Sequence, residues 1–322
     1  MIDVTRNTSS ESSPHAESFA GDVTVILSTF NGNAFLQEQL NSLYSQTYPN
    51  IKIFARDDGS TDATRQILER AQADGRITVL TDHENLGAAA SFFRLLQSVD
   101  TGTEYVAFCD QDDVWLPEKI SRAIVALATF RNGRAAAYCS KLDIVDANLT
   151  PIRSTALPEI IGFGNALVEN ICVGCTMVLN RHAIDLVCKN LPANVLIHDW
   201  WCYLVLSCFG EIVFDRDAHI KYRQHDDNAF GAAVGRLDRL ARNAQRFAAG
   251  GNGRDWQSEQ AREFLLTFGN RIPADHLRVL RLFVESKSAF WRRVGLALSN
   301  DIWRQRRVDD LLWRLLILMN RY

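Results

Sequence analysis

Three carboxylates gather within four residues at the point where a short apolar run ends. Asp110, Asp112 and Asp113 directly follow residues 105–109, a run too short for a helix and rich in strand-forming residues. Neighbouring carboxylates repel one another, and hard oxygen ligands of this kind suit Mg²⁺ or Mn²⁺. The pattern therefore indicates a metal site for a phosphate-bearing substrate. The alternative is a solvated acidic turn before a helix that starts at Pro117.

A second candidate for chemistry is Asp199, at the predicted start of an apolar helix over residues 195–209. A carboxylate within hydrogen-bond reach of a hydroxyl acts as a general base. Desolvation by Trp200, Trp201 and the apolar helix raises such a pKa, whereas a helix N-terminus lowers it. The competing interpretation is a helix N-cap, a position where Asp is favoured.

Predicted strands and helices alternate through the first third of the chain and would position these residues. The sequence predicts strands at 23–27, 51–55, 77–80 and 105–109, with helices between them. Asn33 is the expected N-cap of the first helix. Such alternation is typical of a parallel sheet with helices on both faces, and the carboxyl ends of its strands meet at one edge. We expect a nucleotide pocket there, formed by the polar residues that follow the strands: Thr29, Asn31, Asp57, Asp58, Asn85 and the acidic cluster.

The second half of the chain is less regular. An apolar run over 171–179 predicts a strand, 183–191 a helix, and 212–214 and 219–222 two short strands. From residue 235 the pattern is helical and repeatedly basic, and residues 248–253 form the best candidate linker.

Composition narrows the classes of protein. The chain has 322 residues and a formal net charge of -3, which argues against a nucleic-acid protein with a broad basic face. Its seven cysteines form no paired framework, as in a reducing compartment, and the CxxC of Cys172 and Cys175 is expected to be buried strand thiols. Residues 1–22 are polar and read as a disordered tail. No apolar run reaches the roughly 20 residues that span a bilayer. We expect a cytoplasmic protein, with peripheral attachment at the inner face of the cell membrane left open.

Six segments together resemble the family 2 glycosyltransferases of the GT-A fold, an α/β fold with a Rossmann-like mixed sheet. They are VILSTFNG (25–32), RDDGSTD (56–62), ENLG (84–87), CDQDDVW (109–115), HDWW (198–201) and YRQHDDN (222–228). The combination is most similar to bacterial rhamnosyltransferase-like members that build surface polysaccharides. The resemblance implies a catalytic domain over 23–230, with a donor half at about 23–115 and an acceptor half at about 116–230. Residues 231–322 would then form a C-terminal helical extension.

The resemblance also implies roles on the donor side. Thr29 and Asn31 would line the nucleotide pocket. Asp58 would hydrogen-bond the pyrimidine ring, Asp57 would support that loop, and Asn85 would close over the base. Relatives often carry a basic residue just after the ENLG turn, where this chain has alanines at 88–90. A cationic contact to the donor is therefore missing or comes from elsewhere.

On the metal and acceptor side, Asp110 and Asp112 match the family's DxD motif. Asp110 would face the ribose, and Asp112 would ligate the Mg²⁺ or Mn²⁺ that bridges the two phosphates. Asp199 matches the catalytic base. Of Trp200 and Trp201, one would stack on the acceptor sugar and the other would pack in the core. His225 lies where some relatives bring a late residue to the diphosphate or metal.

The implied activity is inverting, metal-dependent sugar transfer. The donor would be a dTDP- or UDP-sugar, with L-rhamnose from dTDP-rhamnose as one candidate. The acceptor would be a saccharide, expected to be lipid-linked, in the synthesis of O-antigen, capsule or exopolysaccharide. The main alternative is a non-catalytic relative that binds sugar nucleotides or glycans. A nucleotidyltransferase is disfavoured, because STFNG is not the Gly-rich basic loop that such an enzyme shows after its first strand.

The last stretch of the chain interleaves arginines with Trp and Leu. Residues 287–322 hold eight basic and three acidic residues. This pattern suits a helix that lies in a membrane interface. It equally suits helices that pack on the catalytic domain or on a second subunit of a homodimer, with the arginines solvated.

Overall fold

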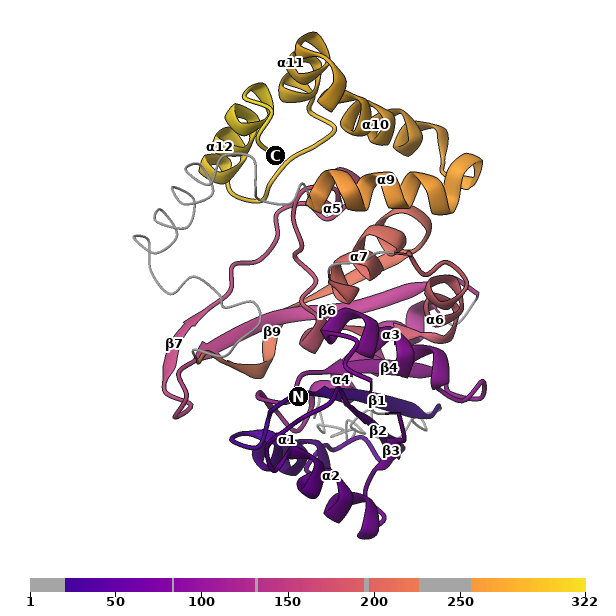
Figure 1. The fold of residues 1–322 in the computed structure, drawn as a ribbon, viewed down its shortest axis with the longest axis vertical. Coiled ribbons are helices and arrows are strands. Elements are labelled where there is room, and N and C mark those ends of the chain that lie inside the picture. Colours follow the sequence, from indigo (N-terminus) through magenta and orange to yellow (C-terminus); the bar gives the residue numbers. More distant parts are fainter. Residues whose placement is uncertain (1–20, 83, 131–132, 194–196, 226–255) are drawn as a thin grey trace, which may run out of the picture.

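The computed structural model describes residues 21–82, 84–130, 133–193, 197–225 and 256–322. Over these residues the strands form one nine-stranded mixed sheet in the order β3-β2-β1-β4-β8-β6-β9-β5, with β7 paired to β6 (Figure 1). The expected disordered tail lies almost entirely outside the described residues, as does the candidate linker.

The first four strands are parallel, as the alternating pattern predicts. β1 pairs with both β2 and β4, and β2 pairs with β3. Their bounds are Val23–Thr29 for β1, Ile51–Asp57 for β2, Thr78–Leu80 for β3 and Tyr105–Cys109 for β4. Because all four run in one direction, the loops that follow them lie at one edge of the sheet.

Helices α1 (Leu36–Tyr44), α2 (Thr64–Ala73) and α3 (Ala88–Ser98) connect these strands. The predicted N-cap at Asn33 is wrong, because α1 begins three residues later without a side-chain cap. The Asn33 N–H instead donates to Asp62 Oδ2 at 3.1 Å, so Asn33 contributes to the loops that meet at the sheet edge.

The other half of the sheet is mixed. β8 runs antiparallel to β4 and to β6, whereas β9 runs parallel to β6. The two short strands predicted at 212–214 and 219–222 are one strand, whose register shifts against β6 on either side of Lys141. The strand predicted over 171–179 is mostly a turn, with a 3₁₀ segment at Gly174–Thr176. Bounds are Val114–Trp115 for β5, Ala136–Val145 for β6, Pro151–Ser154 for β7, Val178–Asn180 for β8 and Glu211–Arg223 for β9.

Four further helices lie in this half. They are α4 (Lys119–Leu127), α5 (Phe163–Ala166), α6 (Arg181–Cys188) and α7 (His198–Phe209). The acidic cluster does not cap a helix directly, because β5 and Pro117 separate it from α4. α7 begins one residue before Asp199, which places that carboxylate in the first turn.

Alternate side chains of the central strands face two separate cores. In β1, Val25 and Leu27 pack with α1, α2 and α4 on one face, whereas Ile26 points to the other. That second face is covered by α3, α6 and α7 and continues into the C-terminal helices. The central strands are buried on both faces, as a parallel sheet requires.

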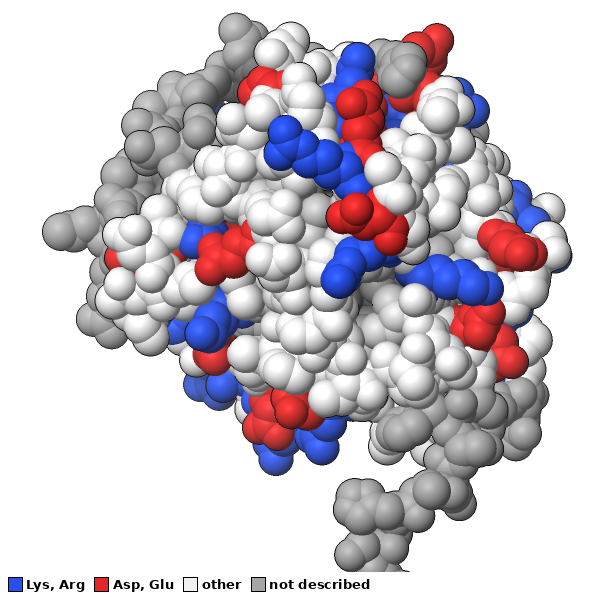
Figure 2. All heavy atoms as spheres, turned by 90° about the horizontal axis from the view of Figure 1, so that it is seen from below, with Lys and Arg blue, Asp and Glu red and all other residues white. Residues whose placement is uncertain are grey.

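The C-terminal region is helical, as expected, and stacks beyond α5 and α7 at the end of the molecule farthest from α2 (Figure 1). It consists of α9 (Trp256–Phe268), α10 (Ala274–Glu285), α11 (Phe290–Leu298) and α12 (Arg307–Leu318). Their inner residues join the hydrophobic cluster of α7. Within the described ranges no helix is both long and apolar enough to cross a bilayer. At the opposite end, Figure 2 shows basic and acidic side chains interspersed over one face.

Candidate active site

The loop after β1 is tied to the acidic loop after β4 by one side chain, Gln111. Its amide accepts from Phe30 N–H at 2.8 Å and donates to Phe30 O at 3.0 Å. A Cβ at Gly32 would lie 2.2 Å from Gln111 Oε1, so a side chain there would displace the Gln111 amide from Phe30. Gln111 thus holds the two loops in register, a role that local sequence patterns do not reveal.

The loops after β1 and β2 are joined through Asn31. Its backbone is left-handed, with φ 49°, and its side-chain oxygen accepts from Thr61 N–H at 2.8 Å. The Asn31 N–H donates to Ser60 Oγ at 2.8 Å. Asn31 therefore lies where the sequence predicts, at the edge of the sheet.

Thr29 and Asp57 lie together beneath these loops, and both side chains are buried. The Thr29 hydroxyl contacts Asp57 Oδ1 at 3.3 Å, and Asp57 also accepts from Ser60 N–H at 3.1 Å. This arrangement agrees with a supporting role for Asp57. The hydroxyl of Thr29 is engaged inside the protein, so its contact with a nucleotide stays a prediction.

Asp58 connects β2 to the turn before α3. Its carboxylate accepts from Leu86 N–H and Gly87 N–H, both at 2.8 Å, and pairs with Arg56 at 2.5 Å. Asn85 is exposed beside Gly59, at the mouth of this loop.

The fully buried Arg56 is a residue that sequence reasoning missed. Its guanidinium also pairs with Asp82 at 2.6 Å and donates to Glu84 O at 2.6 Å. A buried cation that contacts both carboxylates offsets their charge and fixes the ENLG turn. Because Arg56 is completely buried, it supports the turn from beneath, and the source of a cationic contact to the donor stays open.

The carboxylates of the acidic loop after β4 are close enough to raise one another's pKa. Burial, reinforced by the charges on Asp112 and Asp199, raises the pKa of Asp110 to about 8. Burial and the same loop's charges raise the pKa of Asp113 well above its usual range. Asp113 is completely buried, and its Oδ1 accepts from Arg223 N–H at 3.0 Å. Asp110 and Asp112 remain partly accessible at the edge of the sheet.

The end of β9 returns to this loop and supports it. His225 Nε2 lies 2.9 Å from Asp112 Oδ2, so His225 lies beside the candidate metal site, and its role there stays a prediction. The buried Arg223 donates from Nε to Asp112 O at 2.8 Å and pairs with Glu38 of α1 at 2.5 Å. It also bonds Ala147 O in the turn between β6 and β7. Arg223 was not predicted, because these partners are more than 70 residues away.

The residues of this loop fit a divalent cation. Asp110, Asp113 and Cys175 bring one ligand atom each within 4.8 Å of one another. Burial keeps the Cys175 thiol protonated, since its pKa is raised well above 9, and Asp113 is held by Arg223. This leaves Asp110 and Asp112 as the accessible hard ligands. Two carboxylates that repel each other in a partly desolvated site are the donors that a cation stabilises.

Asp199 enters the same site from the first turn of α7. Its Oδ2 accepts from Gly174 N–H at 2.6 Å, while its buried Oδ1 has no hydrogen-bond partner among the described residues. Burial raises its pKa to about 6, against the opposing hydrogen bonds from the backbone of Gly174 and Trp200. Its charge acts on Asp110 across the site. The structure thus brings together two motifs that lie nearly 90 residues apart.

The two tryptophans beside Asp199 differ in environment, as expected. Trp201 is completely buried against Phe264 and Phe268, at 5.7 and 6.2 Å between ring centroids. Trp200 is half-buried, and its Nε1 donates to Ala166 O at 2.7 Å. Trp201 therefore packs in the core, Trp200 packs against the edge of the same cluster, and stacking of Trp200 on the acceptor sugar stays a prediction.

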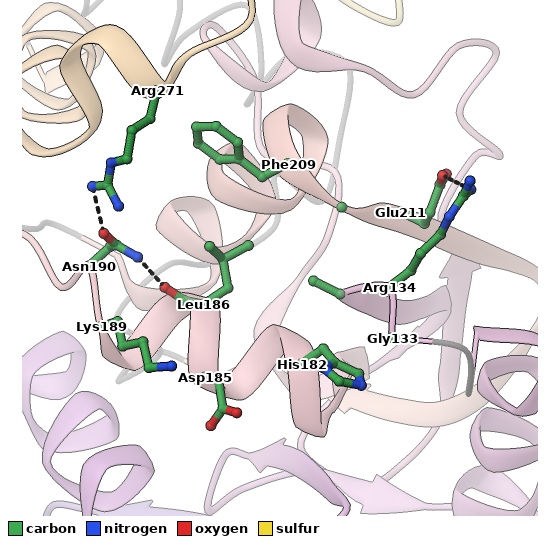
Figure 3. Close-up of a pocket in the computed structure, with 12 residues that line it drawn as sticks. Gly133, Arg134, His182, Asp185, Leu186, Lys189, Asn190, Phe209, Glu211 and Arg271 are labelled. Carbon is green, nitrogen blue, oxygen red and sulfur yellow. Dashed lines mark hydrogen bonds and ion pairs between the residues drawn. The ribbon is translucent and has the colours of Figure 1, made fainter.

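A separate hollow of about 790 Å³ lies at the opposite edge of the sheet (Figure 3). It is lined at the starts of β6 and β9 by Arg134 and Glu211, and on α6 by His182. Because β6 runs in the same direction as β4, its start is far from the end of β4, where Asp110 lies. None of the predicted site residues lines this hollow, so we do not assign the chemistry to it.

Comparison with known proteins identifies the family of the chain. The model of the family described as glycosyl transferase family 2 matches residues 24–185. That match spans half of the chain, and the chain belongs to this family. It is a glycosyltransferase with the GT-A fold that the sequence predicts.

Individual relatives cover larger parts of the chain. The dTDP-rhamnosyl transferase RfbG of Shigella flexneri is 30% identical and aligns with 65% of this chain and 74% of its own length. The UDP-Glc:alpha-D-GlcNAc-diphosphoundecaprenol beta-1,3-glucosyltransferase WfgD of Escherichia coli is 30% identical over 51% of this chain and 62% of its own length. Among solved structures, S. aureus TarS 1-349 shares the fold with a TM-score of 0.53 at 16% identity, covering 93% of this chain and 80% of that one.

Proposed function

We propose that this glycosyltransferase inverts the anomeric carbon, with Asp199 as the general base. The observation that carries the proposal is the approach of Asp199 to the acidic loop: its Oδ2 accepts from Gly174 N–H at 2.6 Å, and the ligand atom of the next residue, Cys175, lies within 4.8 Å of that of Asp110. An acceptor hydroxyl between them would lie beside a base and opposite the diphosphate leaving group. Direct attack from that side inverts the configuration.

The environment of Asp199 suits proton removal near neutral pH. With its pKa raised to about 6, the carboxylate is ionised at pH 7 yet more basic than an ordinary Asp. Its Oδ2 is fixed by Gly174 N–H, which leaves Oδ1 to accept the acceptor's proton. Trp200, at the same end of α7, would stack on the acceptor sugar.

We assign the acidic loop to Mg²⁺ or Mn²⁺, with Asp112 and Asp110 as ligands and His225 as their neighbour. When bound, such a cation neutralises the charge that develops on the leaving diphosphate. Arg223 and Gln111 hold the loop that presents the two carboxylates.

The donor would be a nucleoside diphosphate sugar held over the ends of β1, β2 and β4. Asn31 and Asn85 are exposed there, and we assign nucleotide contacts to them and, on the resemblance, to Thr29 and Asp58. The similarity to RfbG favours a dTDP-sugar, with L-rhamnose as the sugar to test first. UDP-sugars are the second class of donor to test.

The similarity to WfgD favours a saccharide on a lipid diphosphate as the acceptor, as in surface polysaccharide synthesis. Such an acceptor would be used at the cytoplasmic face of the membrane. We propose a catalytic domain over 23–230, with donor and acceptor halves that meet near residue 115, and a helical region from 231.

A panel of dTDP- and UDP-sugars, each with EDTA, Mg²⁺ or Mn²⁺, tests the proposal through release of nucleoside diphosphate. We expect turnover with one donor class, only with metal, and a product of inverted configuration by NMR. Donor binding without turnover, even with saccharide acceptors present, would favour the non-catalytic alternative. Retention at the anomeric carbon would refute the role of Asp199 as base.

A further inference from the structure

Helices α11 and α12 carry apolar residues on two opposite faces. The inner faces are buried: Leu296 and Ala297 of α11, and Trp313 and Ile317 of α12, belong to the large hydrophobic cluster. The outer faces are also apolar, although they are exposed in the part of the chain that the structure describes. We call these exposed residues the outer apolar surface: Phe290, Trp291, Leu298, Val308, Leu311, Leu315 and Met319.

The outer residues recur with helical spacing. On α12, Val308, Leu311, Leu315 and Met319 are three or four residues apart and therefore share one face. Trp291 is 79% exposed, although Trp is usually buried for most of its surface. Since the inner faces already anchor both helices, folding does not require an apolar outer face. A concentration of exposed apolar side chains marks an interaction surface.

Basic residues flank this surface. Arg306 and Arg307 are exposed where α12 begins, and Arg292 is exposed on α11, where it pairs with Glu285 at 2.8 Å. Residues 287–322 hold eight basic and three acidic residues in a chain whose net charge is -3, so positive charge is concentrated at this end. In Figure 1, this end lies farthest from α2 along the long axis of the molecule.

We propose that the outer apolar surface docks on an anionic lipid bilayer, with α11 and α12 lying in the interface. Apolar side chains between arginines match a layer of anionic headgroups over acyl chains. A symmetric dimer through this surface would bring together two regions of the same net positive charge, and that repulsion disfavours a second copy. This inference goes beyond the proposed function and does not depend on which sugar is transferred.

Vesicle flotation of the full chain tests the proposal. The vesicles are phosphatidylcholine alone or phosphatidylcholine with phosphatidylglycerol. We expect the chain to float only with the anionic vesicles and to be released at high salt. Leu311→Ser should weaken binding roughly tenfold, as loss of a buried leucine contact predicts. Arg307→Gln should weaken it about fivefold, since each basic residue near an anionic surface contributes about that factor.

Matched variants elsewhere serve as controls. Val125, on α4, is 65% exposed against 61% for Leu311, so Val125→Ser tests the loss of an exposed apolar side chain as such. Arg70, exposed on α2, provides Arg70→Gln as the charge control. Both controls should float like the parent chain.

Light scattering measures whether the outer apolar surface instead binds a second copy of the chain. The proposal would be overturned if the chain did not bind anionic vesicles at low salt. This holds whether the chain is a monomer or a dimer that Leu311→Ser dissociates. Equal loss of flotation in Leu311→Ser and Val125→Ser would also overturn it, because binding would then not involve α12. A monomer that floats, and that only the α12 variants release, supports it.

Discussion

Replacing Asp199 by Asn tests whether ionisation of the buried carboxylate destabilises the folded protein, as its raised pKa requires. The N-cap of α7 is Ile197, so the alternative role of Asp199 as a helix N-cap is wrong. Burial raises the pKa of Asp199 from 3.8 to about 6 in the folded protein. A shift of roughly two units corresponds to about 3 kcal/mol, by which the ionised carboxylate destabilises the folded state. Asn carries no charge and still offers an oxygen to Gly174 N–H, so it removes this cost.

The size of the effect depends on pH in a defined direction. Below about pH 4 the carboxyl is protonated in both the folded and the unfolded chain, and no cost exists. The cost develops as the pH rises from 3.8 and is complete above 6. We therefore expect Asp199→Asn to be more stable than the parent, by about 3 kcal/mol at pH 8 and roughly half of that at pH 5.

Urea unfolding in metal-free buffer at both pH values measures this difference. Asp275→Asn is the control, since Asp275 is an exposed acidic residue in the first turn of α10. In the same variant, turnover should fall about 10²–10⁴-fold while donor affinity, measured by calorimetry, stays unchanged. A variant that is less stable than the parent at pH 8 would show that the ionised carboxylate of Asp199 stabilises the fold and that our reasoning is wrong.

Three other predictions concern the same site. Asp112→Asn should nearly abolish turnover and weaken metal-dependent binding of nucleoside diphosphate, and full activity with unchanged metal dependence would exclude it as a ligand. Arg223→Gln should raise the Mn²⁺ concentration for half-maximal turnover about 10–100-fold, the range for residues that orient metal ligands, whereas an unchanged metal requirement would make Arg223 purely structural. Gly174→Ala should lower turnover at least about tenfold with intact donor binding, because a Cβ there would lie 2.7 Å from His198 Nε2 and 3.3 Å from Asp199 Oδ2; wild-type turnover would show that the position of Asp199 tolerates displacement.

Local patterns predicted the donor half of the sheet well. Each strand from β1 to β4 is a short apolar run followed by polar residues, and all four run in parallel, although β4 lies beside β1 and not beside β3. Parallel topology brings the loops that follow these strands to one edge of the sheet. For this reason Asn31, Asn85 and Asp110 lie where the sequence places them.

The acceptor half was predicted less well, because its pairings are distant in sequence. β6 was not predicted, and it pairs with β8 and β9, the latter more than 60 residues away. β9 was divided into two strands, since its exposed residues around Arg216 break the apolar pattern at the register shift. Hydrophobic periodicity does not show that β9 continues as one strand, because its continuity depends on hydrogen bonds with β6.

The sequence by itself determined the family, the acidic loop and the candidate base. All three can be predicted from residue types that lie close together in the sequence. Only the tertiary structure decided what supports them: Arg56 beneath the ENLG turn, Gln111 between two loops, and Arg223 from β9 under the acidic loop. A buried polar side chain must find partners wherever the fold brings them, and those partners leave no periodic trace in the sequence. The approach of Asp199 to Asp110 is likewise a product of the fold, because β8 pairs with β4 and the 3₁₀ segment just before β8 bonds Asp199 through Gly174 N–H.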